Sequence, residues 1–278
     1  MILSGKARLA GVLGWPVTHS LSPRLHGYWL EQHGIDGAYL PLAAKPKALS
    51  NVVSALVELG FRGFNVTIPH KESVRGLCHA LDPDAERIGA VNTVVIEDGR
   101  LRGSNSDAFG FMANLRQGAP AWQADAGPAV VLGAGGAARA VIVALLDAGV
   151  PAIRLCNRTP GRAEALASMF RPTIETVPWG DDAALLDGAA LLVNCTSLGM
   201  NGQPPLELDM AKLPRNALVA DLVYAPLETA LLRAARQRGN PTVDGLGMLL
   251  HQARRGFASW FEVEPEVTEE LRRFVLAG

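Results

Sequence analysis

The chain has 278 residues, of which 49% are hydrophobic, enough for two domains that each bury a core. Its formal net charge is −1 and no block of basic residues stands out, which argues against a nucleic-acid-binding protein. There is no apolar run of about 18 residues, and the first residues lack the organisation of a secretory signal. We therefore expect a cytoplasmic protein with no membrane association.

The cysteines and histidines argue against two further classes of protein. Cys78, Cys156 and Cys195 are odd in number and far apart, which is typical of reduced thiols and not of a disulfide framework. The six histidines form no close pair at metal-ligand spacing, so we expect no metal site.

The first 128 residues predict alternating strands and helices followed by a connector. The expected strands are at 6–14, 38–42, 63–68, 90–95 and 100–104, and the expected helices start at Ser22, at 46, after Pro69 and at 108. Residues 117–128, rich in Gly, Ala and Pro, have the composition of a connector.

Two serines mark the start of the first helix. Ser22 followed by Pro23 is typical of a helix start with serine as the N-cap. Ser20 and Ser22 together also place two neutral hydroxyls at a helix N-terminus, which suits a carboxylate ligand. The sequence leaves both interpretations of Ser22 open and favours a structural role for His19 over that of a base.

Lys71 and Asp107 are the candidate groups for proton transfer. Lys71 lies in the first turn of a helix, where a cation opposes the helix dipole by about 0.3–1 kcal/mol. It is either a solvated surface lysine or a lysine held beside a strand end, near Thr67, for proton transfer. Asp107 precedes a helix and is an N-cap in the simplest interpretation. Asn92 lies within an expected strand, where asparagine is disfavoured.

Residues 129–139, AVVLGAGGAAR, predict a strand, a glycine turn and a helix. The turn matches the dinucleotide fingerprint at Gly133, Gly135 and Ala138, the last in the variant that allows alanine. Gly133 permits a sharp turn, Gly135 lets the backbone approach a pyrophosphate, and Ala138 lets helix and strand pack closely. Free N–H groups at the helix start then face the anion. The alternative is an ordinary turn between a strand and a helix.

The rest of the chain continues the alternation, which implies a doubly wound parallel sheet. The expected strands are at 152–156, 173–177, 190–195 and 217–222, and the expected helices are at 181–186, 226–239, 245–261 and 266–277. Ligands bind at the carboxyl ends of such strands, which places Thr196, Leu222 and Tyr224 near a nicotinamide. The terminal helix is expected to pack on the first segment.

Two stretches bear on which ligands are bound. After the strand at 152–156 an NAD site would carry a carboxylate, but this chain has Asn157, Arg158 and Thr159, and then Arg162. Guanidinium groups can hold a 2′-phosphate, so NADP is favoured over NAD, with a solvated arginine pair as the alternative. Further on, Gly245, Met248, Leu249 and Gln252 recur on one helical face. Gln252 is the exception among expected core residues, because a buried amide needs partners.

The chain resembles the shikimate dehydrogenase family over nearly its whole length. The motifs that carry the resemblance are HSLSP, NVTIPHKE, GAVNT, SNSD, GAGGAAR, NRTPGR, NCTSLGM, DLVY and GLGMLLHQ, which occur in the family's order. The resemblance implies NADP-dependent, reversible reduction of 3-dehydroshikimate to shikimate, a step of chorismate and aromatic amino-acid biosynthesis. It also implies two α/β domains: a substrate-binding domain at 1–107 with 245–278, and a Rossmann-type NADP domain at 108–244, with a cleft between them.

The resemblance also implies a role for each matching residue. Lys71 and Asp107 are the expected catalytic pair, and which of them moves the proton is left open. The expected substrate ligands are Ser20, Ser22, Thr67, Lys71, Asn92, Asp107, Tyr224 and Gln252. The expected cofactor ligands are Gly133, Ala134, Gly135, Gly136 and Ala137 at the pyrophosphate, Asn157, Arg158, Thr159 and Arg162 at the 2′-phosphate, and Thr196, Leu222, Gly245 and Met248 near the nicotinamide.

The sequence departs from the family pattern at a few positions and leaves some properties open. Ser106 stands where threonine is usual, His70 stands where phenylalanine is common, and DAFGF follows Asp107 in place of the usual DG-x-G. None of these changes a proposed ligand. A quinate/shikimate dehydrogenase with broader substrate or cofactor use and a non-catalytic shikimate- or NADP-binding regulator stay as alternatives. A homodimer is neither indicated nor excluded by the sequence.

Overall fold

The computed structural model describes residues 2–277, and the chain divides into two compact units. The first unit comprises Met1–Asp107 and Leu249–Gly278, and the second comprises Ala108–Met248. The sequence-based division placed residues 245–248 in the first unit, whereas the structure assigns them to the second. The physical reason is packing, because Met248 is buried in the hydrophobic core of the second unit.

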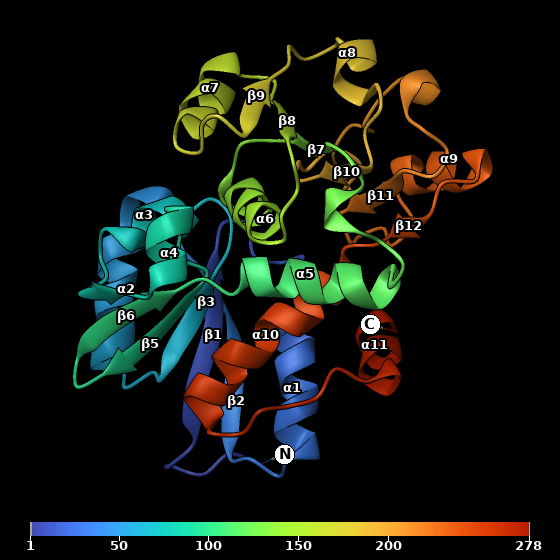
Figure 1. The fold of residues 1–278 in the computed structure, drawn as a ribbon. Helices are drawn as coiled ribbons and strands as arrows, with labels where there is room; N and C mark the ends of the chain where they lie inside the picture. Colours follow the sequence, from blue (N-terminus) through green and yellow to red (C-terminus); the bar gives the residue numbers. More distant parts are fainter. Residues whose placement is uncertain (1, 278) are drawn as a thin grey trace. The chain divides into compact units, whose positions relative to one another are not determined.

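The first unit is built on a mixed six-stranded sheet in the order β2-β1-β3-β5-β6-β4 (Figure 1). Its strands are β1 (Arg8–Gly14), β2 (Gly37–Ala43), β3 (Gly63–Val66), β4 (Ala80–Leu81), β5 (Thr93–Glu97) and β6 (Arg100–Ser104). Its helices are α1 (Ser22–Gln32), α2 (Leu49–Glu58) with the short 3-10 turn η1 (Pro46–Ala48) before it, α3 (Lys71–Arg75), α4 (Pro83–Ile88), most of α10 (Leu246–Phe261) and α11 (Glu269–Leu276). Strands β2, β1 and β3 are parallel, and β5 runs antiparallel to β3 and β6.

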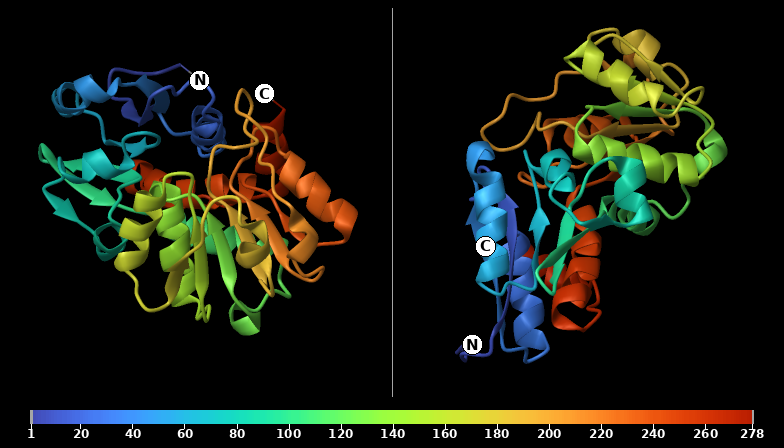
Figure 2. Two further views of the ribbon diagram at one scale, coloured as in Figure 1. Left: turned by 90° about the horizontal axis from the view of Figure 1, so that it is seen from above. Right: turned by 90° about the vertical axis from the view of Figure 1, so that its left-hand side faces the viewer.

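Successive side chains along each strand point to opposite faces of this sheet. Different helices cover the two faces (Figures 1 and 2). Phe64 and Val66 join the α2 residues Leu49, Val53 and Leu56 in one hydrophobic cluster. On the other face, the Trp260 indole of α10 donates a hydrogen bond to the Val94 carbonyl at 3.0 Å. A Cβ at Gly63 would lie 2.2 Å from Trp260 Nε1, so only glycine lets α10 pack this closely on the sheet. Asn65 and Thr93, described below, point to this second face, because they alternate with Phe64 and Val94 along their strands.

The second unit has a parallel six-stranded sheet in the order β12-β11-β10-β7-β8-β9. Its strands are β7 (Ala129–Leu132), β8 (Ile153–Cys156), β9 (Ile174–Thr176), β10 (Leu191–Asn194), β11 (Leu218–Asp221) and β12 (Thr242–Val243). Its helices are α5 (Asp107–Gly118), α6 (Gly136–Asp147), α7 (Pro160–Ser168), α8 (Asp182–Leu186) and α9 (Ala230–Arg238), with the 3-10 turns η2 (Ala124–Ala126) and η3 (Met210–Lys212). This is the strand order of a dinucleotide-binding sheet, with its topological switch point between β7 and β10.

Both faces of this second sheet are buried, as expected for a parallel sheet. Helices α5, α6 and α7 pack against Ala129 and Val131 on one face, and α8 and α9 pack against Val130 and Leu132 on the other. Four consecutive apolar residues in β7 are therefore all core residues. The prediction of a doubly wound parallel sheet is confirmed.

The predicted elements are correct in kind, and most of the errors lie at their ends. Asn92 lies just before β5 and not inside a strand. Helix α1 begins at Ser22, with Leu21 in the N-cap position, and within the described chain no side chain caps this end, so the interpretation of Ser22 as the N-cap is wrong. Strand β4 and helix α4 were not predicted, because two- and six-residue elements carry little periodicity.

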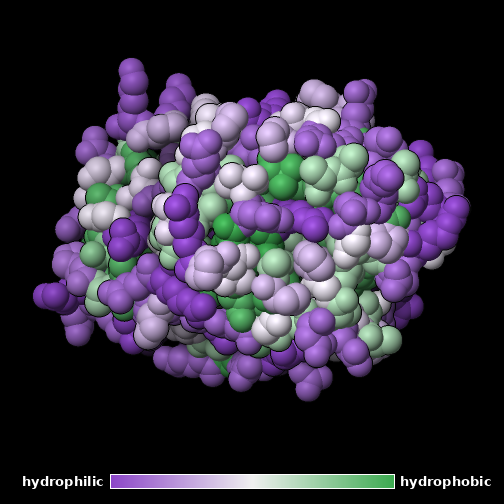
Figure 3. All heavy atoms as spheres, turned by 45° about the horizontal axis from the view of Figure 1, so that its top comes forward, coloured by the Kyte–Doolittle hydropathy of each residue, from purple (hydrophilic) through white to green (hydrophobic). Residues whose placement is uncertain are grey.

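The terminal helix packs as predicted. Trp29 Nε1 of α1 donates to the Glu266 carbonyl at 3.1 Å, and Arg24 Nε donates to the Phe274 carbonyl of α11 at 2.7 Å. The three cysteines are free thiols. Hydrophilic residues predominate on the face drawn in Figure 3. Among residues 2–277, no helix combines the length and the apolar character that a membrane span requires.

Candidate active site

Lys71 is placed by the end of β3. After β3 the chain turns through Thr67 and enters α3 at Lys71, and the Thr67 N–H donates to the Leu13 carbonyl at 2.9 Å. The Lys71 carbonyl accepts a hydrogen bond from the Val91 N–H at 2.8 Å, which ties this turn to the segment before β5. The prediction that Lys71 lies in the first turn of a helix beside a strand end is confirmed.

Asp107 follows β6 and is the first residue of α5. Its backbone N–H donates to Asn105 Oδ1 at 2.9 Å, and Asn105 Nδ2 donates to the Ala90 carbonyl at 2.7 Å, so a buried asparagine fixes the turn. The carboxylate points away from this turn, and Oδ2 accepts a hydrogen bond from Lys71 Nζ at 2.5 Å. The side chains of Lys71 and Asp107 are 17% and 5% exposed, so the ion pair is largely shielded from water.

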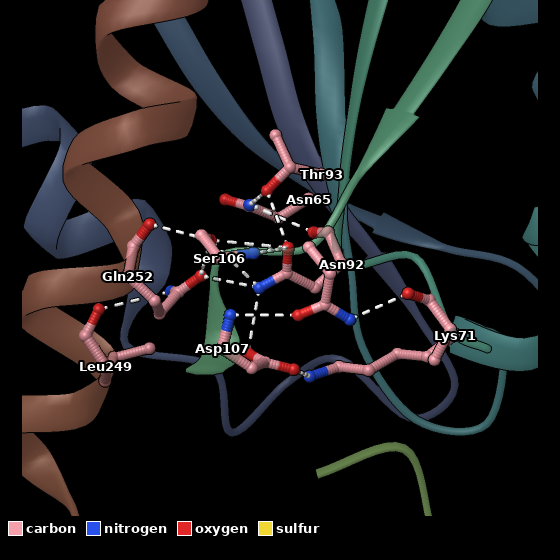
Figure 4. Close-up of polar contacts among 10 residues, drawn as sticks. Asn65, Lys71, Asn92, Thr93, Ser106, Asp107, Leu249 and Gln252 are labelled. Atoms are coloured by element: carbon pink, nitrogen blue, oxygen red, sulfur yellow. Dashed lines mark hydrogen bonds and ion pairs between the residues drawn. The ribbon is translucent and has the colours of Figure 1, made fainter. Parts of the chain in front are cut away.

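The Asn92 side chain donates a hydrogen bond to the other carboxylate oxygen of Asp107 (Figure 4). Its Nδ2 donates to Asp107 Oδ1 at 2.8 Å and also lies 3.1 Å from Ser106 Oγ and 3.2 Å from Gln252 Oε1. Its Oδ1 accepts from the Ser106 N–H at 2.9 Å and from Thr93 Oγ1 at 2.9 Å. Because the oxygen of the amide is held by donors, its NH₂ group must face the carboxylate.

Gln252 reaches the same cluster from α10. Its Oε1 faces Asn92, its Nε2 donates to the Leu249 carbonyl at 3.1 Å, and its backbone carbonyl accepts from Ser106 Oγ at 3.0 Å. Four of the predicted site residues, Lys71, Asn92, Asp107 and Gln252, are thus joined by hydrogen bonds within the first unit. Gln252 finds protein partners for its amide, and Ser106, noted in the sequence only as a departure, joins the cluster.

Ser20 and Ser22 lie together at the start of α1. The Ser22 N–H donates to Ser20 Oγ at 3.3 Å, and Ser22 is 5% exposed. Thr67 packs on the neighbouring strand end, where a Cβ at Gly14 would lie 2.4 Å from Thr67 Cγ2. These three residues belong to the first unit. The two serines therefore lie on the same unit as the Lys71 cluster but form a separate group of polar side chains.

Sequence reasoning missed several buried polar residues of the first unit. Asn65 of β3 is 5% exposed, Thr93 of β5 is 2% exposed, and the two are paired across the antiparallel ladder. Asn65 Nδ2 donates to Thr93 Oγ1 at 3.1 Å and to the Asn92 carbonyl at 3.1 Å. The signal was available, since an asparagine within the buried strand GFNV is as unfavourable as the Asn92 that did attract notice.

In the second unit, the glycine turn has the geometry of a pyrophosphate cradle. Gly133 has φ of +105°, and a Cβ there would lie 3.2 Å from the Cys195 carbonyl carbon, so the turn at the end of β7 requires glycine. A Cβ at Gly135 would meet nothing within 4 Å, which leaves open space above the turn. Gly135 is also the N-cap of α6 and offers no side chain to its N–H groups. These features fit a bound phosphate.

The end of β8 carries exposed cationic residues and no carboxylate. Asn157 Nδ2 donates to the Thr159 carbonyl at 2.9 Å and shapes the loop into α7. Arg158 and Arg162 are exposed on this loop and on the first turn of α7. An exposed guanidinium at this edge suits a phosphate on the adenosine ribose, so these residues fit NADP.

The remaining predicted cofactor residues follow β10 and β11. A Cβ at Gly245 would lie 2.3 Å from the Leu222 carbonyl oxygen, so these two segments touch only because residue 245 is glycine. Thr196 Oγ1 donates to Asn194 Oδ1 at 2.7 Å. Tyr224 is half-buried, and burial raises the pKa of its phenol. Met248 is a core residue of this unit and lies one helical turn before Gln252 on α10, so the two share one face of the helix as predicted.

A buried carboxylate in this unit was also missed by the sequence. Asp221, the last residue of β11, accepts hydrogen bonds from Asn194 Nδ2 at 2.9 Å, the Val223 N–H at 3.0 Å and Thr229 Oγ1 at 2.7 Å. Desolvation by burial raises the pKa of Asp221 to about 6, and these hydrogen bonds oppose the rise. Asp221 therefore shapes the loop that carries Leu222 and Tyr224. Within residues 2–277, no three His, Cys, Asp or Glu side chains are grouped as metal ligands.

Comparisons with known proteins show the family of the chain. Residues 12–94 match the family described as the shikimate dehydrogenase substrate binding domain, and residues 121–202 match the family described as shikimate / quinate 5-dehydrogenase. A protein of Paramagnetospirillum magneticum named shikimate dehydrogenase (NADP(+)) is 61% identical over 99% of this chain and 100% of its own.

Solved structures show the same relationship. The shikimate 5-dehydrogenase of Thermus thermophilus in complex with NADP(H) and shikimate has a TM-score of 0.86 and 38% identity, over 97% of this chain and 99% of its own. A quinate dehydrogenase from Corynebacterium glutamicum in complex with NAD has a TM-score of 0.88 and 32% identity, over 98% of this chain and 99% of its own. The identity and coverage of these relatives establish that the chain belongs to the shikimate dehydrogenase family.

Proposed function

We propose that the chain catalyses the reversible reduction of 3-dehydroshikimate to shikimate with NADPH, and that Lys71 and Asp107 carry the chemistry. The observation that supports this most directly is the shielded Lys71–Asp107 ion pair, held by Asn92 in a chain of this family. Carbonyl reduction places negative charge on an oxygen, and a fixed ammonium in a water-poor site stabilises such charge strongly.

The substrate carboxylate is assigned to Ser20, Ser22 and Tyr224. Since Ser22 does not occupy the N-cap position of α1, its hydroxyl is not committed to that role. Three neutral hydroxyls hold a carboxylate by hydrogen bonds without adding a cation. Tyr224 lies in the second unit, and its assignment rests on the family resemblance of the DLVY motif.

The ring hydroxyls and the reacting carbonyl are assigned to Thr67, Lys71, Asn92, Asp107 and Gln252. The last four are already joined by hydrogen bonds in the first unit, which supports one continuous polar surface. Buried polar groups discriminate strongly against a substrate that lacks a matching hydroxyl, because they are then left unpaired.

The proton steps follow from the placement of Lys71. NADPH, when bound, supplies a hydride to the ketone carbon. Lys71 Nζ stabilises the charge that develops on the ketone oxygen and donates the proton that completes the alcohol. Asp107 Oδ2 keeps the ammonium in place, while its Oδ1 stays with Asn92. In the direction of oxidation, Lys71 in its neutral form accepts the hydroxyl proton.

NADP is assigned to the second unit. Gly133, Ala134, Gly135, Gly136 and Ala137 would bind the pyrophosphate through the open turn at the start of α6. Asn157, Arg158, Thr159 and Arg162 would bind the 2′-phosphate, and Thr196, Leu222, Gly245 and Met248 would border the nicotinamide.

A quinate dehydrogenase is the second candidate, because a neighbour with that title shares the fold over almost the entire chain. The two candidate functions differ in substrate and in cofactor. The purified full chain should therefore be assayed for nicotinamide reduction with shikimate and with quinate, each with NADP⁺ and with NAD⁺. Shikimate with NADP⁺ is expected to give the highest kcat/KM. A higher kcat/KM with quinate and NAD⁺ would favour the second candidate, and tight shikimate binding without turnover of any pair would favour a regulator.

A further inference from the structure

A line of buried side chains crosses the first sheet, and each one donates a hydrogen bond to the next. Tyr39 OH of β2 donates to Asn65 Oδ1 at 2.6 Å. Asn65 Nδ2 donates to Thr93 Oγ1 at 3.1 Å, and Thr93 Oγ1 donates to Asn92 Oδ1 at 2.9 Å. Asn92 Nδ2 then donates to Asp107 Oδ1 at 2.8 Å, where the line ends on a carboxylate (Figure 4 shows the part from Asn65 onward).

The donor and the acceptor of each hydrogen bond in this line can be assigned in only one way. Asn65 Nδ2 also faces the Asn92 carbonyl at 3.1 Å, and a backbone carbonyl can only accept. Asn65 Oδ1 must therefore face Tyr39, whose hydroxyl must donate. Thr93 Oγ1 accepts from Asn65 and so turns its own hydrogen toward Asn92. Asn92 is left with its NH₂ group toward Asp107.

We propose that Tyr39 is a positioning residue for the reaction, acting through Asn65 and Thr93 on the Asn92 amide that orients Asp107 beside Lys71. This inference rests on the proposed function. If Asn92 were reversed, its carbonyl oxygen would face the carboxylate and repel it. Bonds aligned in one direction also polarise one another, so the Asn92 N–H is a better donor to Asp107 than an isolated amide.

Tyr39 is held rigidly enough for this role. Its ring stacks on His26 with centroids 3.8 Å apart and planes at 3°. Desolvation by burial lowers the pKa of His26 to about 3, which the nearby Asn65 side chain partly opposes, so the imidazole is neutral. Trp29, Phe257 and Trp260 enclose it. Burial also raises the pKa of Tyr39 well above its usual range, so the phenol keeps the hydrogen that it donates.

Tyr39 also adjoins the assigned carboxylate site. The Ser22 side chain is near enough to the Tyr39 phenol to oppose the rise in its pKa that burial causes. Tyr39 therefore lies between a residue assigned to the substrate carboxylate and the residues that orient Asp107. The line gives the two ends of the substrate site a common internal support.

The test compares two conservative variants, alone and together. Tyr39→Phe and Thr93→Val each keep the side-chain shape and remove one hydroxyl. We expect each to lower kcat for shikimate oxidation about three- to tenfold, the loss of one oriented hydrogen bond, with KM for NADP⁺ unchanged. Because both act through Asn92, the double variant is expected to lose little more than either single variant. Tyr28→Phe, a hydroxyl deletion at a half-buried tyrosine of α1 outside this line, is the matched control and is expected to keep wild-type kcat.

Different experimental results would overturn the positioning role of Tyr39 and the proposed function. Unchanged kcat in folded Tyr39→Phe, or multiplied losses in the double variant, would overturn the positioning role while the wild-type activity stands. Wild-type protein without shikimate-dependent NADP⁺ reduction would overturn the proposed function instead. If Tyr39→Phe does not fold, Thr93→Val carries the test with Thr176→Val of β9 as its control, and equal kcat values in those two would overturn the inference.

Discussion

Lys71 Nζ lies 2.5 Å from Asp107 Oδ2, and the side chains of the two residues are only 17% and 5% exposed. Removing one member of a buried ion pair leaves an uncompensated charge, which costs more than the pair contributes. The pair is therefore sensitive to substitution in both its chemistry and its stability, and these effects have to be measured separately.

Lys71→Ala is expected to lower turnover by a factor on the order of 10²–10⁴, because it removes the group that we propose stabilises and protonates the ketone oxygen. NADPH binding is expected to persist, since the glycine turn belongs to the second unit. Steady-state shikimate oxidation measures the turnover, and a fluorescence titration measures the NADPH affinity. Lys6→Ala, at an exposed lysine before β1, is the control. Near wild-type turnover in Lys71→Ala would remove Lys71 from the mechanism.

Arg158→Gln is expected to weaken NADP⁺ binding roughly 10- to 100-fold, the value of a charge-assisted hydrogen bond to a phosphate. NAD⁺ lacks that phosphate, so its affinity should change by less than about twofold. Titration with both nucleotides by calorimetry gives the ratio of Kd values. Arg233→Gln, at an exposed arginine of α9 that lies 3.6 Å from Glu228, is the control. Equal losses for NADP⁺ and NAD⁺ would contradict the assignment of Arg158.

Gly135→Ala separates cofactor binding from folding. With φ of −95° and nothing within 4 Å of the added Cβ, the free energy of unfolding should change by less than about 0.5 kcal/mol. The methyl group nevertheless occupies the surface where backbone approaches the pyrophosphate, so NADP⁺ affinity should fall at least about tenfold.

Substitutions at two other glycines serve as comparisons for Gly135→Ala. Gly133→Ala should lower the melting temperature as well, because φ there is +105° and Cys195 is in contact. Gly27→Ala in α1, where an added Cβ meets nothing within 4 Å, should affect neither cofactor affinity nor turnover. Unchanged NADP⁺ affinity in Gly135→Ala would argue against the turn as the pyrophosphate site.

Asp221 makes stability depend on pH. Its pKa is raised from 3.8 to about 6 by desolvation, so between these values the folded state binds more protons than the unfolded state. The protonated Asp221 side chain therefore contributes to the free energy of unfolding. This contribution is complete below pH 3.8 and is lost as pH rises through 6. Asp221→Asn keeps an acceptor for Val223 and Asn194 but cannot ionise. Relative to this variant, the wild type should lose roughly 1 to 3 kcal/mol of unfolding free energy across that range.

Denaturant unfolding of both proteins at several pH values from about 4 to about 7 measures this difference. Asp125→Asn, at an exposed aspartate of η2, is the control and should follow the wild-type curve. Parallel curves for wild type and Asp221→Asn would show that the carboxylate is not desolvated in the fold.

The fold was largely predictable because strong local signals agreed with the tertiary structure. Four apolar residues, a glycine turn and an alanine-rich run specify β7 and α6 without any help from distant residues. β4 and α4 could not be found in this way, because β4 is defined by its pairing with β6, a partner more than twenty residues away in the sequence.

The site was predictable residue by residue only through its motifs. No local pattern shows that Lys71, Asn92, Asp107 and Gln252 meet, since these contacts join residues up to 160 positions apart in the chain. Thr93 and Tyr39 were overlooked because each is an ordinary strand residue by itself, whereas Asn65, an unusual residue in a buried strand, was a signal that was not used. Only the strand register, which pairs Asn65 with Thr93, brings them into line.

The line of donors from Tyr39 to Asp107 passes through two amide side chains, and an amide cannot take up a proton at one end and release another at neutral pH. The line therefore polarises the carboxylate without conducting protons, and no Grotthuss-type path runs along it to the Lys71–Asp107 ion pair. In the proposed mechanism, the proton consumed or released in turnover therefore exchanges with bulk water through Lys71, the more exposed member of the pair. A solvent isotope effect on turnover is thus expected to include proton transfer at this ammonium group and no transfer along the line.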